Sequence, residues 1–311
     1  MADKPQTYSQ NEIMSSELPN SRLTHIPYCK ADKLDYSVSI QGNKGSFHHA
    51  AAEFMFGTVE CKERDRFEDV FKDCSSGNAE YGLVAIENSI AGSLIYNYDL
   101  LAGSDTHILA EGFLRISHQL IGFKGTKVEE LSEIWSHPMA LNQSKDYLEQ
   151  LEARLIETDD TAGAVRDLKA SGRRDVAAIA SRLAATLYDM EILAGHIETD
   201  PRNYTRFLLV SKDRSIQPVR HVHQTKTTIK FTLKHKPGAL AQFLNMIAFR
   251  GINMTKIQSR PRIGEPWVYD FFIDLEWNGQ DPKDHPLLHE LEDEAHHFKI
   301  LGTYPCFGYL R

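Results

Sequence analysis

Apolar positions along this chain follow two different periods. From residue 36 to about residue 210, short apolar runs alternate with stretches in which apolar residues recur every three or four positions. This alternation is typical of an α/β domain. Strands are expected at 37–40, 58–61, 81–86, 133–136, 155–158, 176–180, 193–197 and 204–210, with two more in the extended stretch 107–123 and helices between most of them.

A second pattern begins after a polar stretch around residue 214. Ile229, Phe231 and Leu233 alternate with polar residues and predict a strand, and a one-sided apolar stripe predicts a helix over 239–250. The remaining elements are expected as strands at 254–259 and 268–275, a helix around 287–295 and a last strand at 298–304. The resulting order, β-α-β-β-α-β, is that of a ferredoxin-like domain.

Two folded domains fit a chain of 311 residues. The expected divisions are a polar N-terminal extension at 1–35, an α/β domain at 36–213, a linker at 214–226, the ferredoxin-like domain at 227–305 and a C-terminal tail at 306–311.

Charge and composition narrow the function. The 35 basic and 43 acidic residues give a net charge of −8. No run of Lys and Arg forms a stripe that could follow phosphates, so nucleic acid and anionic membranes are not expected as partners. The four cysteines are scattered and no signal-like apolar run opens the chain, so free thiols and a cytoplasmic protein are expected. His285 and His289 share a helix face but lack further ligands at suitable spacing, so no metal is expected.

Polar side chains gather where the expected strands of the first domain meet its helices. They are Ser46, Asn88, Ser89, Thr161, Thr205 and Arg206. In open α/β sheets ligands bind beyond the carboxyl ends of strands, and these donors, with hardly any pairing of a nucleophile with a base, suit a carboxylate ligand. Each residue alone also fits a structural role. Arg206 could pair with a surface carboxylate, and Asn88 and Ser89 could satisfy their own backbone.

Short motifs occur in a fixed order along the chain. They are Gly42-x-x-Gly45-Ser46-Phe47, Ile86-Glu87-Asn88-Ser89 followed by Gly92-Ser93, Ser136-His137-Pro138, Thr205-Arg206-Phe207, Gly238-Ala239-Leu240 and Ser259-Arg260-Pro261. With this set, the chain resembles prephenate dehydratases that carry a C-terminal ACT regulatory domain. The resemblance covers about residues 36–305, and the ordered set is more specific than any single motif.

The resemblance implies a two-lobed catalytic domain of the type II periplasmic-binding-protein kind, with substrate in the cleft between the lobes. It implies conversion of prephenate to phenylpyruvate in L-phenylalanine biosynthesis, a carbon–oxygen lyase reaction, without a cofactor. Thr205 is expected to donate a hydrogen bond or proton to the leaving hydroxyl, and Arg206 to hold a substrate carboxylate as a fork. The further substrate-binding residues implied are Ser46, Asn88, Ser89, Thr161 and Phe207. Glu87 is expected to face away from the cleft, with a proton-donating role as the alternative, and His137 either touches substrate or caps a helix.

The second domain is expected to bind L-phenylalanine as an allosteric effector. The effector-binding residues implied are Gly238, Ala239, Leu240, Gln258, Ser259 and Arg260. Gln258 stands where the family typically has Glu, which leaves the strength of inhibition open. Met139 and Asp160 replace the usual Gln and Ser and are expected not to touch the Thr-Arg-Phe core. ACT-like units commonly pair, so a homodimer or homotetramer is expected.

Two alternatives stay open. Arogenate, with an amino group in place of the side-chain keto group of prephenate, is a close alternative substrate. A non-catalytic sensor of amino acids or dicarboxylates is an alternative of another class, which the missing export signal and the intact Thr205–Arg206 pair disfavour.

Overall fold

A computed structural model describes residues 36–57, 59–215, 225–262, 264–277, 282 and 285–310. The expected N-terminal extension and most of the expected linker lie outside the described residues. None of the described helices is long and apolar enough to cross a membrane.

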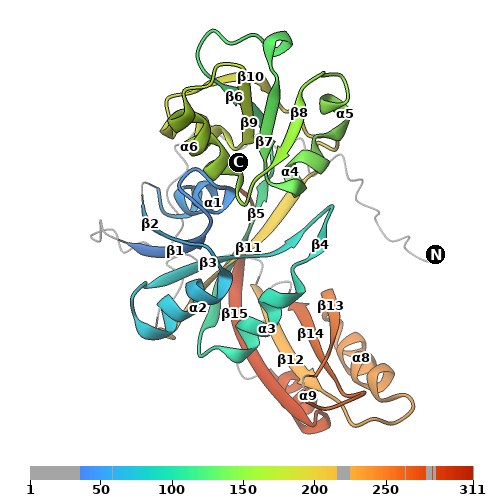
Figure 1. Cartoon of the computed structure of the whole chain (residues 1–311). Helices are drawn as coiled ribbons and strands as arrows, with labels where there is room; N and C mark the ends of the chain where they lie inside the picture. Colours follow the sequence, from blue (N-terminus) through green and yellow to red (C-terminus); the bar gives the residue numbers. More distant parts are fainter. Residues whose placement is uncertain are drawn as a thin grey trace, which may run out of the picture.

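The first region contains two sheets, and the chain passes between them twice (Figure 1). One half of the larger sheet has the strand order β5-β11-β3-β1-β2. Its strands are β1 (Ser37–Gln41), β2 (Glu60–Arg64), β3 (Tyr81–Asn88), β5 (His107–Arg115) and β11 (Tyr204–Ser211), with the short β4 (Gly92–Ser93) paired to β3. Its helices are α1 (Phe47–Phe56), α2 (Phe67–Ser76) and α3 (Ile95–Gly103).

The second sheet has the order β10-β6-β9-β7-β8. Its strands are β6 (Gln119–Gly122), β7 (Glu133–Ser136), β8 (Arg154–Glu157), β9 (Val176–Ala180) and β10 (Glu191–Gly195). Its helices are α4 (Pro138–Gln143), α5 (Lys145–Leu148), α6 (Thr161–Ser171) and α7 (Arg182–Leu187), and a 3-10 turn covers Val128–Glu130. The segment from β5 to β6 leads into this sheet and the segment from β10 to β11 leads back. The predicted crossing between two lobes is therefore observed.

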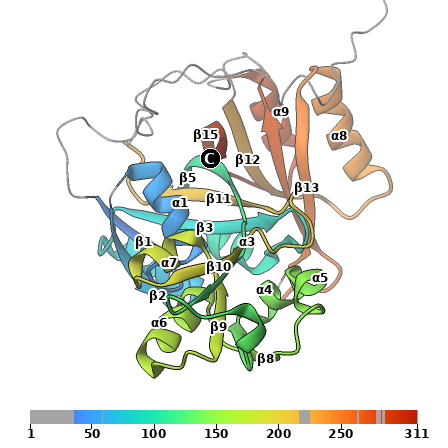
Figure 2. The same cartoon turned by 90° about the horizontal axis from the view of Figure 1, so that it is seen from above.

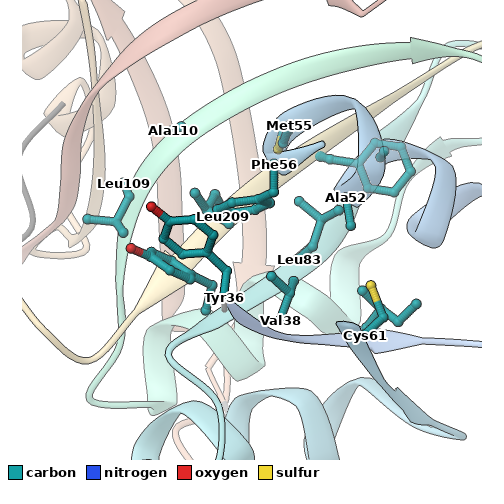
Figure 3. Close-up of a cluster of buried hydrophobic side chains, with 14 of the residues drawn as sticks. Tyr36, Val38, Ala52, Met55, Phe56, Cys61, Leu83, Leu109, Ala110 and Leu209 are labelled. Atoms are coloured by element: carbon teal, nitrogen blue, oxygen red, sulfur yellow. The ribbon is translucent and has the colours of Figure 1, made fainter. Parts of the chain in front are cut away.

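Each sheet has its own hydrophobic core. In the first, α1 lies on the sheet and buries Met55 and Phe56 against Leu83 and Leu209 (Figure 3). Full burial of one such side chain contributes about 1.5–3 kcal/mol, so the alternating and continuous apolar runs of the sequence supply most of the folding free energy here. The second sheet packs a separate cluster, in which α6 covers β9.

The C-terminal region shows the predicted β-α-β-β-α-β order. Its elements are β12 (Thr225–Thr232), α8 (Ala239–Phe249), β13 (Asn253–Pro261), β14 (Tyr269–Glu276), α9 (Pro286–Glu294) and β15 (His297–Leu310). The strand order is β13-β14-β12-β15. Both helices cover the face that turns away from the first sheet (Figure 2), where the rings of Phe231 and Phe243 stack 4.0 Å apart.

The last strand corrects the expected domain limits. A tail was predicted at 306–311, but β15 runs to Leu310 and pairs in parallel with β5, with Cys306 opposite Glu111 and Leu310 opposite Leu114. The C-terminal strands and the first sheet therefore form one continuous sheet. The predicted linker also ends earlier than expected, because β12 begins at Thr225.

Candidate functional site

A cavity of about 430 Å³ lies between the two sheets of the first region. The first sheet and its helices contribute Ser46, Phe47, His48, Asn88, Ser93, Thr205 and Phe207 to its lining. The second sheet and its helices contribute His137, Met139, Gln143, Asp160 and Thr161, and the crossing segment contributes His118. The predicted residues Ser46, Asn88, Thr161, Thr205 and Phe207 are therefore brought together at one cavity.

Arg206 lies elsewhere, contrary to the prediction that it binds a substrate carboxylate. Successive side chains of a strand point to opposite faces of the sheet, so Thr205 and Phe207 share the cavity face and Arg206 points the other way. Its guanidinium is buried against Glu111 and Asp274, at N–O distances of 2.7 and 2.6 Å. The same alternation, applied to the motif as a strand, would have predicted this.

Asn88 determines how the Thr205 hydroxyl is oriented. The Asn88 side-chain oxygen accepts from the backbone N–H groups of Ile90 (3.0 Å) and Ala91 (2.8 Å). Because a backbone N–H can only donate, the other end of this amide is the NH2 group, which lies 3.1 Å from Thr205 Oγ1 and donates to it. Thr205 thus uses its oxygen toward Asn88, and its own hydrogen is available to a group in the cavity.

A chain of amides continues from Asn88 across to the second sheet. Asn88 Nδ2 donates to Asn203 Oδ1 (2.7 Å), and Asn203 Nδ2 donates to Gln143 Oε1 (2.9 Å). The same Gln143 oxygen lies 2.9 Å from His118 Nε2. Because this oxygen can only accept, His118 carries its proton on Nε2. Burial lowers the pKa of His118, which favours this neutral ring.

Two helices begin at the cavity, and a side chain caps each of them. Ser46 Oγ accepts from the His49 N–H at the start of α1 (3.2 Å), and Asp160 Oδ1 accepts from the Gly163 N–H at the start of α6 (2.6 Å). The first N–H groups of a helix have no intrahelical acceptor and carry partial positive charge. The start of α1, whose cap is an uncharged serine, therefore suits a ligand carboxylate, whereas the start of α6 already holds the Asp160 carboxylate.

The charged side chains of the cavity are acidic. Among the described lining residues, Asp159 and Asp160 carry carboxylates and none is Lys or Arg. Met139 and Asp160, which were expected not to touch the Thr-Arg-Phe core, line the same cavity as Thr205. They stand at the starts of α4 and α6. Negative charge in the cavity favours a ligand that carries a cationic group as well as carboxylates.

Ser89 does not line the cavity. Its hydroxyl donates to Arg202 O and accepts from Tyr204 N, both at 2.9 Å, so it ties the end of β3 to the start of β11. Glu87 is also outside the lining and lies 2.9 Å from Lys256 Nζ. Glu87 therefore faces away from the cavity, as predicted.

His137 caps a helix, which was one of its two predicted roles, and it also lines the cavity. It is among the cavity-lining residues, and its Nδ1 accepts from the Met139 N–H (3.1 Å) as the N-cap of α4.

The predicted effector residues are separated in this chain. A second cavity, of about 410 Å³, is lined by Ala239 and Leu240 at the start of α8, directly after Gly238 with its φ of 80°. The lining of this cavity does not include Gln258, Ser259 or Arg260, which lie on β13. Arg260 is instead paired with Asp99 of α3, with 2.7 Å between Nη2 and Oδ2.

A protein-family model described as prephenate dehydratase matches residues 38–215. This chain belongs to the prephenate dehydratase family. The match covers both sheets of the first region and every residue of the cavity between them. The predicted enzyme class, a carbon–oxygen lyase, is confirmed at the level of the family.

Relatives and solved structures extend the similarity over most of the chain. The chain is 34% identical to Arogenate dehydratase/prephenate dehydratase 1, chloroplastic, of Arabidopsis thaliana, over 97% of this chain and 76% of that protein. A prephenate dehydratase from Arthrobacter aurescens, solved in complex with L-Phe, is similar with a TM-score of 0.77 and 26% identity, over 86% of this chain and 89% of that one. The structure of GqqA, described as a novel type of quorum quenching acylase, is similar with a TM-score of 0.79 and 30% identity, over 87% and 98% of the two chains.

Several residues of this dehydratase-family site were not predicted from the sequence. They are His48, His118, Gln143 and Asn203. Burial lowers the pKa of His48 to about 3, so its Nε2 is a neutral acceptor for the Ala85 N–H (3.3 Å). Only Asn203 had a local signal, because it stands two positions before Thr205 and extended chain places such residues on one face.

The described residues also bear on other chemistries. Among them, no group of three or more His, Cys, Asp or Glu could hold a metal ion. The described hydroxyls that line the cavity show no hydrogen bond to a histidine side chain or carboxylate, which is the pairing that activates a serine or threonine nucleophile.

Proposed function

We propose that this protein is a prephenate dehydratase that converts prephenate to phenylpyruvate, carbon dioxide and water. In this reaction the bond between the ring and its carboxylate breaks, and the electron pair enters the ring as it becomes aromatic. The ring C–O bond breaks on the opposite side, and the departing hydroxide takes up a proton to leave as water. The observation that carries the proposal is the Thr205 hydroxyl, whose hydrogen is left available to a leaving oxygen by the Asn88 donor.

Thr205 needs to supply only modest acid assistance. Aromatisation drives the reaction, and one oriented donor contributes about 2.7–4 kcal/mol of transition-state stabilisation. The side-chain carboxylate of the substrate would bind the N–H groups at the start of α1, with Ser46 and Thr161 as further donors. A departing carboxylate must lose its charge to become carbon dioxide. Because none of the described lining residues is Lys or Arg, the lining would not stabilise the charged form of this carboxylate with a cationic side chain.

The test is turnover of prephenate by the purified protein. We expect phenylpyruvate to form, with the same rate in EDTA as without it. If the protein bound prephenate without turning it over, it would be a sensor of dicarboxylates instead.

Arogenate is a second candidate substrate, and the acidic lining favours it. Arogenate carries an ammonium group beside its side-chain carboxylate, and Asp160 could pair with this cation from the cavity wall. Asp160→Asn keeps the N-cap oxygen of α6, because Asn caps helices about as well as Asp. If Asp160 recognises the ammonium, this variant lowers kcat/KM for arogenate by about tenfold or more and lowers that for prephenate much less. An equal change for both substrates would refute this role. Asp167→Asn, on the exposed face of α6, is the matched control for loss of one charge.

We also propose that the C-terminal region is an ACT domain that binds L-phenylalanine and inhibits the enzyme. The element order, the left-handed Gly238 at the head of α8 and the similarity to a dehydratase solved with L-Phe support this proposal. The two effector motifs, 238–240 and 258–260, do not line one cavity within a single chain. A homodimer or homotetramer in which the motifs of neighbouring subunits meet would complete the site.

The regulatory proposal predicts that L-phenylalanine lowers turnover and D-phenylalanine does not. Gln258→Glu should strengthen inhibition, because the added carboxylate can pair with the effector ammonium. Equal responses to the two enantiomers, or no response to either, would contradict it.

A further inference from the structure

Arg206 is held at the junction between the two regions of the protein. Its Nη1 lies 2.6 Å from Asp274 Oδ2 on β14, and its Nε lies 2.7 Å from Glu111 Oε2 on β5. Its Nη2 donates to the Tyr304 hydroxyl on β15 at 3.1 Å. One side chain of β11 thus contacts strands of both the first sheet and the C-terminal region.

The surrounding groups complete a neutral, buried cluster. Lys226 Nζ of β12 lies 2.7 Å from Glu111 Oε1, so two cations balance two carboxylates. Thr228 Oγ1 donates to Asp274 Oδ1 at 2.7 Å. Glu111 is 0% exposed, Asp274 1% and Arg206 6%. Buried charges are stable only while they are paired, so removing one member of the cluster would leave another charge buried without its partner.

This cluster lies directly beneath the cavity. Arg206 stands between the cavity-lining residues Thr205 and Phe207. At this point the pairing of β11 with β3 shifts register, between Arg206 and Phe207. The bulge interrupts the ladder on the β3 side, whereas β11 stays paired with β5 in regular register through this segment. The side chain of Arg206 adds a further anchor at the bulge, to Glu111 on β5 and to Asp274 on β14.

A second, partly buried contact reaches the cavity wall from the same region. Lys256 Nζ of β13 lies 2.9 Å from Glu87 Oε2 and 2.9 Å from Ser93 Oγ. Ser93 lines the cavity, and Glu87 directly precedes Asn88. Both contacts from the C-terminal region therefore end on a residue of the cavity wall or on its immediate neighbour.

We propose that the C-terminal region positions the catalytic wall of the cavity. Asp274 holds Arg206, and Lys256 holds Glu87 and Ser93, so that Thr205 keeps its place. Asp274 and Lys256 are positioning residues, because they act through other side chains and do not reach the cavity. The expected effect on turnover rests on the proposed function, whereas the expected effect on the strands does not.

The test compares two isosteric substitutions on one strand, in the full chain. Asp274→Asn removes the charge that faces Arg206, and we expect kcat to fall roughly 10- to 100-fold with KM changed much less, because small misplacement of a catalytic group has effects of this size. The control is Asp270→Asn. Asp270 is also buried on β14, but it pairs with Lys230 at 2.7 Å and accepts from Thr232, both within the C-terminal region. This control should keep kcat near that of the wild type.

Two milder variants cover the case in which Asp274→Asn does not fold. Lys256→Gln should lower kcat with KM little changed, and Tyr304→Phe, which removes one hydroxyl contact to Arg206, should do so to a smaller extent. Asp274→Glu, which keeps the charge, should restore part of the turnover lost in Asp274→Asn.

Amide hydrogen exchange separates this proposal from the proposed function. In Asp274→Asn the amides of β11 around Thr205 should exchange faster than in the wild type, and in Asp270→Asn they should not. The proposal is overturned if Asp274→Asn matches Asp270→Asn in both kcat and exchange, or if Lys256→Gln and Tyr304→Phe match the wild type where Asp274→Asn does not fold. If the wild type turns over neither prephenate nor arogenate, the proposed function fails, and the exchange comparison still decides the positioning role.

Discussion

Replacement of Thr205 by valine tests the proposed mechanism most directly. Valine has nearly the same shape, so packing at this buried position is kept and only the hydroxyl is lost. The Asn88 NH2 group retains two acceptors, Asn203 Oδ1 at 2.7 Å and Tyr204 O at 3.2 Å. No buried donor is therefore left without a partner, and the free energy of unfolding should fall by about 1 kcal/mol or less.

The effect on turnover should be much larger. Loss of one donor to the leaving oxygen costs about 2.7–4 kcal/mol in the transition state, so kcat should fall roughly 10²- to 10³-fold. KM should change little, because the proposed binding group for the substrate carboxylate is the start of α1 and not Thr205. The assay is the initial rate of phenylpyruvate formation from prephenate, with urea unfolding measured on the same preparations. Thr205→Ser, which keeps the hydroxyl, should retain most of the activity. A folded Thr205→Val variant within threefold of the wild-type kcat would refute the role of this donor.

Three further predictions follow from the same geometry. His48, whose pKa burial lowers from 6.5 to about 3, binds a proton when the chain unfolds, so its contribution to stability is complete above pH 6.5 and is lost as the pH falls below that value. Between pH 7 and pH 5, the unfolding free energy of the wild type should therefore fall by about 2 kcal/mol more than that of His48→Gln. Urea unfolding at both pH values measures the two changes. Gly302→Ala places a Cβ 2.5 Å from the Ile108 carbonyl oxygen and should destabilise the protein by about 1–3 kcal/mol. Gly103→Ala places its Cβ in open space and should not destabilise it. Equal melting temperatures of the two variants would contradict this prediction. Ser89→Ala should lower stability by about 1–2 kcal/mol through its two lost hydrogen bonds and leave KM for prephenate unchanged, and a large rise in KM would place Ser89 in the cavity after all.

Much of the fold could be predicted because local pattern and burial agree. The strand predicted at 81–86 lies within the buried strand β3, and the helix predicted over 239–250 corresponds to α8. The end of β15 could not be predicted, because its pairing partner β5 lies nearly 200 positions earlier in the chain. Helix α3 was not predicted either. Its apolar residues are spread around the helix, and no N-cap side chain hydrogen-bonds its first turn.

The residues of the cavity likewise divide into those that could be predicted from the sequence and those that could not. Thr205, Asn88, Ser46 and Thr161 could be selected because each stands at the junction of a strand and a helix or opens an element, where side chains reach a ligand. His118 and Gln143 gave no such signal, since their roles depend on a hydrogen-bond chain between two sheets.

By itself the sequence determined the two kinds of domain, the family, and the set of strand and helix ends from which a carboxylate site could be built. Hydrophobic period, helix capping and motif order can be identified from the sequence alone, because they are local properties. Strand alternation alone separates Arg206 from Thr205 and Phe207, but only the tertiary structure decided which face of β11 meets the cavity and which partners each residue has there. Thr205 faces the cavity with its proton available, and Arg206 faces a buried cluster completed by Asp274 from the other end of the chain. The physical reason is that charge pairing and hydrogen-bond direction depend on partners that long-range folding alone brings together.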